Sequence, residues 1–428
     1  MIKRMIYLVL LTLFFSCKKE EIDNKSPTIS ILLPLQNQIF TALDTIQVRG
    51  IITDNIGITS FSISLRNSNN INVLLGISKN LSTITYNLNE QIILDDLYLT
   101  SGSYTLKMSA FDGVNQTDSY IPLTINEFPK TRNGFFVFSN SGSINQVSKL
   151  SNALIATSFS ISYGDFLNGL VNSYSHEVIT CPSSTGNFSS YDIAVGSENW
   201  NLFNNASGLP NFTGIDQYNH EIYVAFYNGN IRSYLNSNVP EFSGFSLVNS
   251  YARKFYVHVN NLLITEQPEI SGGKIRLVSY YLASGAIKDN VELNEDVVSM
   301  FDFSANEVVL FSNASGNGKI KVYNINSNST WQPFALNTGT ISSCTELCRG
   351  IYLIAQNGNV ITVNMNNFTF STYLSAVNAT IVKYDVVTNE VVVTGGNILT
   401  VYDYSTKSIK GTYTHSNIIL AFDFWYNK

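Results

Sequence analysis

Two His-Glu pairs are the residues in this sequence that could most readily perform acid–base chemistry. His176-Glu177 and His220-Glu221 each place an imidazole beside a carboxylate, and such a pair can move a proton near neutral pH. Both pairs occupy the same position of a repeated pattern, where Asn306-Glu307 and Asn389-Glu390 stand elsewhere. We therefore interpret them as turn residues of separate structural units, and we assign no catalytic residue.

Three cysteines lie beyond the N-terminal segment. Cys344 and Cys348 flank a predicted turn, and their separation favours a local disulfide. Cys181 is then left as a small buried residue. A metal site needs more ligands than these cysteines supply, so we expect neither a metal nor another cofactor.

Three aspartates, Asp216, Asp302 and Asp385, recur at one position of the same repeat. Carboxylates that line a channel would suit a lyase, a lactonase or a glycosidase, so an enzyme is one alternative function. A repeated position favours a structural role instead, because a functional site usually breaks a repeat. The sequence has no Gly-x-Ser-x-Gly elbow, His-Glu-x-x-His helix or phosphate loop, and we expect no enzyme.

The repeat that carries these residues has a period of 40 to 46 residues. The first-turn residues Glu177, Glu221, Asn261, Glu307, Gly350 and Glu390 mark it. Each unit holds short apolar runs that are separated by Asn-Gly, Gly-Gly or similar turns, which are strong hairpin signals. Four short strands in a unit of this length predict a β-propeller blade.

The two ends of the repeat region predict how the ring closes. Residues 418–425 match the first strand of a unit, whereas residues 134–138 and 144–149 match a second and a third strand with no first strand before them. The C-terminal strand would therefore complete the N-terminal blade and remove a free sheet edge. We predict a propeller over residues 133–428 with about seven blades, six and eight being alternatives.

Two turn sequences extend this interpretation. Asn228-Gly229-Asn230-Ile231 and Asn317-Gly318-Lys319-Ile320 resemble the strand entries of WD-like and quinoprotein-type propeller repeats. Most units lack the tryptophan that recurs in quinoprotein repeats, so quinone binding is not expected.

Residues 27–127 form a separate predicted domain. Seven short alternating runs in about 100 residues are typical of an immunoglobulin-like (Ig-like) sandwich, so the chain as a whole is predicted to be all-β. The segments 26–29, 54–58 and 102–113 resemble Ig-like modules of bacterial surface proteins. Asp54 and Asp112 are interpreted as turn-stabilising residues, with calcium binding as an alternative. The domain would act as a spacer.

The N-terminal segment predicts export. Lys3 and Arg4 precede an apolar run that ends at Leu13-Phe14-Phe15-Ser16-Cys17, so residues 1–16 read as a signal peptide. A small residue before Cys at this point resembles the lipobox of bacterial lipoproteins, which implies lipidation of Cys17 after cleavage. Residues 17–26 would then be a tether. Lys18-Lys19-Glu20-Glu21 resembles the surface-export signal of Bacteroidetes lipoproteins, with a plain hydrophilic tether as the alternative.

The net negative charge and the predicted membrane location of the protein limit its possible binding partners. Loss of Lys3 and Arg4 leaves 23 basic against 31 acidic residues, so no basic face is expected and nucleic acid is excluded as a partner. The membrane, through the lipid on Cys17, is the expected partner. We therefore expect a protein anchored to the outer membrane by its lipid, facing the cell surface or alternatively the periplasm.

Ligand binding is the predicted function of the propeller. Loops that gather at one face of the ring carry aromatic and polar side chains suited to contact a ligand, namely Trp200, Phe203, Tyr227, Glu266 and Trp331. The ligand would be a small molecule, a glycan or an outer-membrane protein, by analogy with propeller lipoproteins that capture nutrients at the cell surface. A protein-interaction scaffold or adhesin is the alternative.

Overall fold

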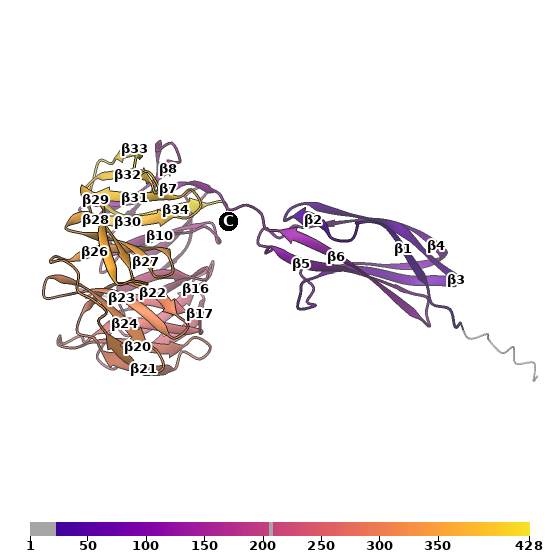
Figure 1. Ribbon diagram of the computed structural model, residues 1–428, viewed down its shortest axis with the longest axis horizontal. Coiled ribbons are helices and arrows are strands. Elements are labelled where there is room, and N and C mark those ends of the chain that lie inside the picture. The colour runs from indigo at the N-terminus through magenta and orange to yellow at the C-terminus, as the bar shows by residue number, and fades with distance from the viewer. Residues whose placement is uncertain (1–22, 205–208) are drawn as a thin grey trace, which may run out of the picture. The chain divides into compact units, whose positions relative to one another are not determined.

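The computed structural model describes residues 23–204 and 209–428 of the chain. Cys17, the signal peptide over residues 1–16 and most of the tether lie outside the described residues, so their assignments stay predictions. The chain divides into two compact units between Pro129 and Lys130 (Figure 1). Each unit is described here by itself.

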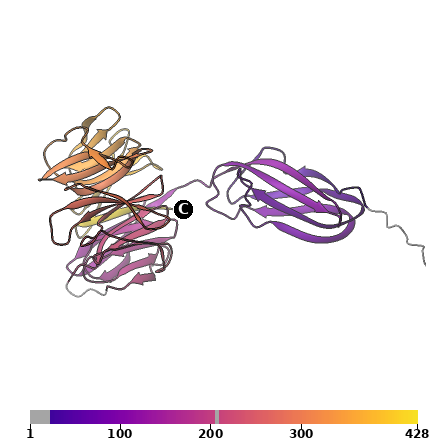
Figure 2. The ribbon, with the colours of Figure 1, turned by 90° about the horizontal axis from the view of Figure 1, so that it is seen from below.

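The N-terminal unit is one curled sheet of six strands, seen from below in Figure 2. Its strands are β1 (Thr28–Leu33), β2 (Gln38–Thr41), β3 (Thr45–Arg66), β4 (Ile77–Ile93), β5 (Gly102–Phe111) and β6 (Gln116–Asn126). Their order is β1-β3-β5-β6-β2, with β4 paired to β3, and only β2 and β6 pair in parallel. The sheet curls around a single apolar core that includes Ile46, Phe61 and Leu106.

The long strand β3 makes this sheet different from the seven-strand pattern in the sequence. It runs for 22 residues and joins the expected second and third strands. The register of β3 against β4 shifts between Thr53 and Ile58, and there the Asp54 carboxylate accepts backbone N–H groups of Ile56 and Gly57. The segment that resembled a turn is therefore a bulge. The all-β class is confirmed, and assignment of this mixed sheet to the Ig-like class stays a prediction.

The second unit contains seven four-stranded antiparallel sheets. Six of them are built from consecutive strands: β10 (Asn168–Asn172), β11 (Glu177–Cys181), β12 (Phe188–Asp192) and β13 (Glu198–Leu202); β14 (Phe212–Tyr218), β15 (Glu221–Phe226), β16 (Asn230–Tyr234) and β17 (Pro240–Phe245); β18 (Lys254–His258), β19 (Leu262–Pro268), β20 (Ile275–Tyr281) and β21 (Ile287–Glu292); β22 (Asp296–Ser304), β23 (Glu307–Ala314), β24 (Asn317–Asn324) and β25 (Ser329–Trp331); β26 (Ile341–Cys348), β27 (Ile351–Gln356), β28 (Gly358–Asn364) and β29 (Thr369–Ala379); β30 (Ile381–Asp385), β31 (Glu390–Gly395), β32 (Ile398–Asp403) and β33 (Ile409–Thr414). We number these blades one to six.

The residue pattern explains why these strands form. The second strands are buried along nearly their whole length, as in β11 and β31, because a neighbouring blade covers each of their faces. The turns between first and second strands hold residues with positive φ, including Asn389 at 55° and His220 at 71°. His176 also has positive φ, at 57°. The His-Glu pairs therefore belong to turns of separate blades, as the repeat predicted.

The seventh blade closes the ring. Its order is β34-β7-β8-β9, with β34 (Ile419–Tyr426), β7 (Arg132–Ser141), β8 (Ile144–Ser151) and β9 (Ala156–Tyr163). Strand β34 pairs antiparallel with β7 from Ile419 opposite Ser139 to Tyr426 opposite Arg132. The predicted closure and the seven-bladed propeller are confirmed.

A buried group of charges joins the closing blade to blade six. Arg132, at the start of β7, donates to Asp385 Oδ2 at 2.9 Å and to Glu390 Oε2 at 2.5 Å. Tyr426 of β34 donates its hydroxyl to Asp385 Oδ1 at 2.9 Å, and Lys410 also pairs with Glu390. Asp385 of blade six is thus held by both strands that meet at the closure, and Glu390 by β7 and by its own blade.

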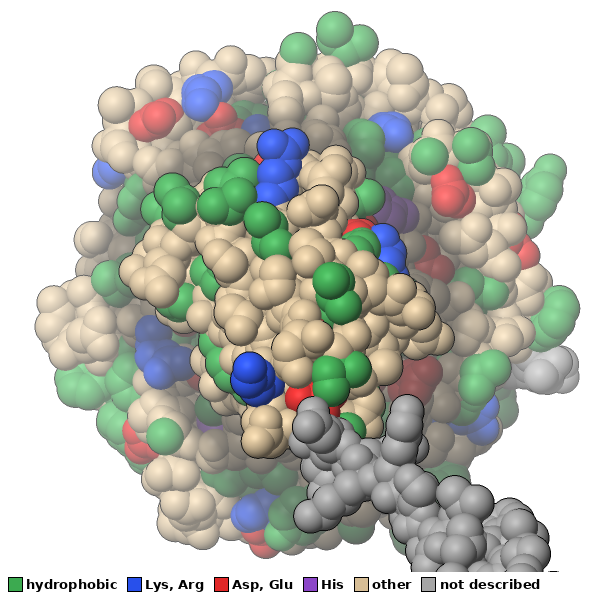
Figure 3. Space-filling view, turned by 90° about the vertical axis from the view of Figure 1, so that its right-hand side faces the viewer, with side chains coloured by type: hydrophobic (Ala, Val, Ile, Leu, Met, Phe, Trp, Pro, Cys, Tyr) green, Lys and Arg blue, Asp and Glu red, His purple; other side chains and the backbone are tan. Residues whose placement is uncertain are grey.

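The surface drawn in Figure 3 carries basic, acidic and hydrophobic side chains scattered among polar ones. Within residues 23–204 and 209–428, no helix is long and apolar enough to cross a membrane.

Candidate functional site

The candidate site is a cavity of about 1220 Å³ in the centre of the propeller. The first strand of every blade contributes to its wall: β10, β14, β18, β22, β26, β30 and β34. Hydroxyl and amide side chains among the lining residues include Asn168, Thr213, Gln217, Ser299 and Ser343. The cavity is therefore the central channel of the ring, and most of the polar groups in its wall carry no charge.

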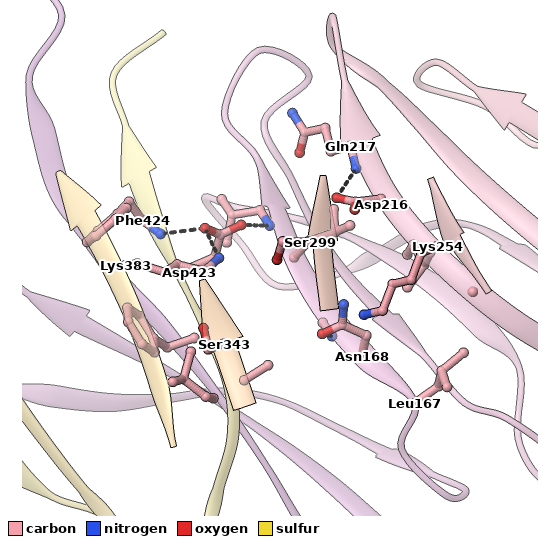
Figure 4. A pocket seen from close by; sticks show the side chains of 18 of the residues that line it. Leu167, Asn168, Asp216, Gln217, Lys254, Ser299, Ser343, Lys383, Asp423 and Phe424 are labelled. Atoms are coloured by element: carbon pink, nitrogen blue, oxygen red, sulfur yellow. Dashed lines mark hydrogen bonds and ion pairs between the residues drawn. The ribbon is translucent and has the colours of Figure 1, made fainter. Parts of the chain in front are cut away.

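One side of the channel holds an ion pair (Figure 4). Lys383 Nζ lies 2.8 Å from Asp423 Oδ1. Asp423 Oδ2 also accepts the backbone N–H of Val171 at 3.0 Å, so this carboxylate links the closing blade to blade one. The pair is compensated in charge and fixed in position, and it presents a polar but nearly neutral wall.

The opposite side holds Asp216 and Lys254 (Figure 4). Asp216 accepts the backbone N–H of Gln217 at 2.9 Å and the hydroxyl of Tyr218 at 3.3 Å. Burial raises the pKa of Asp216, although Lys254 and Lys383 act in the opposite direction. Within the described part of the chain, the exposed Lys254 side chain has no hydrogen bond and no ion-pair partner. Its ammonium is available to an anionic group.

A network of charges lies at the start of the inner strands. Arg253 donates to Glu266 at 2.5 Å and to Asp296 Oδ1 at 2.7 Å. Glu266 Oε1 accepts the backbone N–H of Val297 at 3.1 Å, so its buried carboxylate fixes the beginning of β22. Burial raises the pKa of Glu266, and the charge of Arg253 opposes that shift. These three side chains define one end of the channel.

The turns after the first strands define the other end, where Lys130, Tyr174, His220, Tyr426 and Lys428 line the cavity. The rings of Tyr174 and His220 stack with centroids 3.9 Å apart. Burial lowers the pKa of His220, and the charge of Lys130 lowers it further. The Lys130 ammonium lies 4.1 Å from the centroid of the Tyr426 ring. This end is aromatic and basic.

The structure places one of the five predicted ligand contacts in the channel. Glu266 lines it, whereas Trp200, Phe203, Tyr227 and Trp331 are not among its lining residues. Trp200 is 8% exposed, stacks on Phe188 and donates Nε1–H to Glu177 at 2.6 Å, so it is a core residue of blade one. Tyr227 packs on Tyr251 in a turn. Aromatic content alone therefore does not identify the residues that line the channel, and ligand contact by Phe203, Tyr227 and Trp331 stays a prediction.

Several channel residues were missed from the sequence, above all Lys254, Lys383 and Asp423. Each is a charged side chain on a mostly apolar first strand, and that position is the signal that could have found them. Of the three recurring aspartates, Asp216 lines the channel. Asp302 and Asp385 are not among its lining residues, and Asp385 belongs to the charge group at the closure.

The predicted disulfide between Cys344 and Cys348 is wrong, whereas Cys181 is a small buried residue, as predicted. Cys181, Cys344 and Cys348 are all free, and burial raises the pKa of the Cys181 thiol well above its usual value. Cys344 and Cys348 both lie on β26 instead of flanking a turn. Four residues of extended chain separate Cα atoms by about 13 Å, whereas a disulfide needs less than about 7 Å.

At one end of the N-terminal sheet, carboxylate oxygens of Asp23, Asp54 and Asp112 lie within 4.8 Å of one another. Asp54 and Asp112 accept backbone N–H groups of the residues that follow them, as expected of turn-stabilising aspartates. Calcium binding at this cluster stays an alternative.

The fold and channel define the second unit as a seven-bladed β-propeller with an open, polar centre. No family model matches the chain, and no curated protein matches it. Among solved structures, it is similar to a chain of the nidogen/laminin complex, with 9% identity and a TM-score of 0.42 over 69% of this chain and 100% of that one.

It is also similar to Kuenenia stuttgartiensis hydrazine synthase, with 10% identity and a TM-score of 0.47 over 68% of this chain and 98% of that one. The Dos1 propeller matches with 12% identity and a TM-score of 0.44, over 59% of this chain and 73% of that one.

Proposed function

We propose that this protein is an outer-membrane lipoprotein whose propeller binds a small polar molecule in its central channel. The lipid on Cys17 would anchor it, and the N-terminal unit would hold the propeller away from the membrane. Lipidation, location and ligand are all parts of this proposal. The support for binding comes from the channel, and the support for anchoring comes from the sequence that ends at Cys17.

The unpartnered ammonium of Lys254 in an open channel is the observation that carries the proposal. Ligand sites in proteins commonly have volumes of about 300–1000 Å³ and a few converging polar groups, so a cavity of about 1220 Å³ is large enough for a small ligand. Lys254 would bind an anionic group of the ligand. Ser299, Ser343, Asn168 and the fixed Lys383–Asp423 pair would hydrogen-bond to hydroxyl or amide groups.

An open channel also favours a binding protein over a scaffold. The Lys383–Asp423 pair and Glu266 have structural roles in any propeller, whereas no hydrogen bond or ion pair within the described residues gives the Lys254 ammonium such a role. An enzyme is less well supported, because the three recurring aspartates do not converge on one point.

Native mass spectrometry of the protein purified from its own cells tests the proposal. We expect wild type to carry an additional small molecule that is released on unfolding, and Lys254→Ala to carry at least tenfold less. Lys274→Ala is the matched control, because Lys274 is an exposed lysine of the same blade that pairs with Glu292 outside the channel. No bound mass in wild type, or equal retention by Lys254→Ala, would contradict channel binding.

Membrane anchoring has its own test. Cys17→Ala should move the protein from the membrane pellet to the soluble fraction, because one thioether-linked lipid group is lost together with its acyl chains. Retention of the variant in the pellet after a high-salt wash would sink the lipoprotein proposal and leave the channel proposal unaffected.

A further inference from the structure

Four aromatic side chains form a cluster on the outside of the propeller, between blades four and five. Trp331 of β25 and Phe368 are 43% and 48% exposed, and their ring centroids are 6.2 Å apart. Phe334 lies 6.3 Å from Phe368 and stacks on Phe370 at 6.2 Å with an interplanar angle of 8°. Phe334 and Phe370 are only partly exposed and pack against the core, so they support the two exposed rings from below.

The backbone at Phe368 is unusual for a bulky residue. Its φ is 57°, in the left-handed region that glycine and asparagine tolerate best. The hairpin between third and fourth strands has a residue with positive φ in every other blade too: Leu154, Gly196, Asn236, Gly285, Asn328 and Lys407. Phenylalanine at this point carries a conformational cost, as Leu154 does in the closing blade, and the hairpin places the Phe368 ring in solvent.

The surroundings of the cluster are uncharged. The segments 322–344 and 350–382 contain no Asp, Glu, Lys or Arg. Two lysines contact the first segment: the Lys319 backbone bridges Ala335, and Lys288 donates to the Ile325 carbonyl at 3.1 Å. Amide and hydroxyl residues flank the rings in the sequence instead: Thr330, Gln332, Asn366, Asn367 and Thr369. Thr369 donates to Asn367 at 2.6 Å, and Gln332 donates to the Phe334 carbonyl at 3.3 Å.

We propose that this cluster, Trp331, Phe334, Phe368 and Phe370, binds a neutral glycan chain. The faces of aromatic rings carry negative partial charge, and the C–H groups on a sugar face carry positive partial charge, so sugar rings stack on Trp331 and Phe368. Neighbouring amides and hydroxyls hydrogen-bond to sugar hydroxyls. A charged partner would find no counter-charge in these two segments, and rigid aromatics supply contact area at low entropic cost.

Native affinity electrophoresis tests this inference. The full protein is run in gels that contain amylopectin, mixed-linkage β-glucan, xyloglucan or yeast mannan, with polygalacturonate as the acidic control. We expect retardation by at least one neutral polysaccharide. Trp331→Ala and Phe368→Asn should each weaken it by at least about tenfold, the loss expected for truncation of a central aromatic contact.

Controls separate binding from folding. Asparagine accepts positive φ, so Phe368→Asn should melt at or above the wild-type temperature while it loses binding. Tyr163→Ala removes an aromatic that is 79% exposed on β9, and it should bind as wild type does. Lys254→Ala should also bind normally, so the result does not depend on the channel.

The proposal would be overturned if no neutral gel retards the protein. It would also be overturned if Trp331→Ala and Phe368→Asn are retarded as much as wild type, or if polygalacturonate retards the protein more than every neutral polymer does. Concentration-dependent dimers in sedimentation that Phe368→Asn abolishes, without retardation by any polysaccharide, would assign the cluster to a second copy of this chain and would also overturn it.

Discussion

The closing blade and the six contiguous blades differ in the charged residue at the start of the second strand and in the groups that bind it. In four contiguous blades the second strand begins with a glutamate. In blades one and four its carboxylate accepts a hydrogen bond from its own blade, from Trp200 Nε1 at 2.6 Å and from Ser304 Oγ at 3.1 Å. In the closing blade the second strand β7 begins with Arg132, which reaches Asp385 and Glu390 of the neighbouring blade.

Arginine in place of glutamate at the start of β7 puts an ion pair between blades at the closure. Consecutive strands of one blade are held together by short turns, whereas β34 and β7 meet only when the ring closes. A buried ion pair adds little net stability, because desolvation offsets most of its attraction, but it makes one arrangement much better than the alternatives. Arg132 therefore specifies which blade lies beside the closure.

Removal of residues 418–428 should have the largest effect. It exposes β7, including Phe135, Phe136 and Phe138, which are fully buried, and it leaves Arg132 without Tyr426 beside it. We expect the cooperative thermal transition of the propeller to disappear. Calorimetry measures this, and an unchanged transition would show that the closure does not stabilise the ring.

Arg132→Ala should destabilise the propeller by about 3–5 kcal/mol, because it removes the cation paired with the buried Asp385 carboxylate and leaves Glu390 with Lys410 alone. Urea unfolding measures the free energy. Arg276→Ala is the matched control, since Arg276 makes an exposed hydrogen bond to Asn290, and its effect should stay within about 0.5 kcal/mol. Equal effects of the two substitutions would remove the distinction between closing and contiguous blades.

The propeller should lose stability at acidic pH, in part because Glu390 becomes protonated. Burial alone would raise the pKa of Glu390, but hydrogen bonds from Lys410 and Arg132 lower it below its usual 4.5. A lowered pKa in the folded state gives stability that is present above pH 4.5 and is lost as the pH falls through the folded value. Glu390→Gln should be less stable at pH 7 and should show a shallower loss between pH 5 and 3, roughly the range below the unfolded pKa. Parallel pH profiles for both proteins would contradict this role.

Glu177→Gln should change the free energy of unfolding least, and in the opposite direction to Glu390→Gln. Burial raises the pKa of Glu177, so its contribution to stability is greatest below the unfolded pKa and falls as the pH rises through the folded value. The glutamine Oε1 still accepts the Trp200 hydrogen bond. We expect a change of no more than about 1 kcal/mol at pH 7, toward greater stability. A loss as large as that of Glu390→Gln would mean that carboxylates in contiguous blades are equally indispensable.

The propeller could be predicted from the sequence because turn chemistry is local. Positive φ at residues such as Asn389 and Gly350 demands particular residue types, and their spacing gives the blade period. The bulge in β3 was read as a turn because Asp54 to Gly57 uses the same local hydrogen bonds in both structures. Local signals identify a bend without telling which strands continue through it.

The channel could not be predicted in the same way. Lys254 and Lys383 come together with Asp216 and Asp423 only because four different blades point their first strands at one axis, and no single unit of the repeat contains that information. Aromatic residues were chosen instead, and Trp200 was buried against its own blade. Lipidation at Cys17 and ligand identity stay predictions.

The pairing of β34 with β7 means that β7 has no edge partner until the end of the chain has been made. Strand β7 is synthesised early, and its partner follows roughly 290 residues later, which at about 5–20 residues per second takes about 15–60 s. During that interval the strand that contains Phe135–Phe138 has an open edge and an apolar face, which is the condition in which strands recruit the wrong neighbour. Strand β7 is therefore the element at which mispairing would begin before the final strand is available.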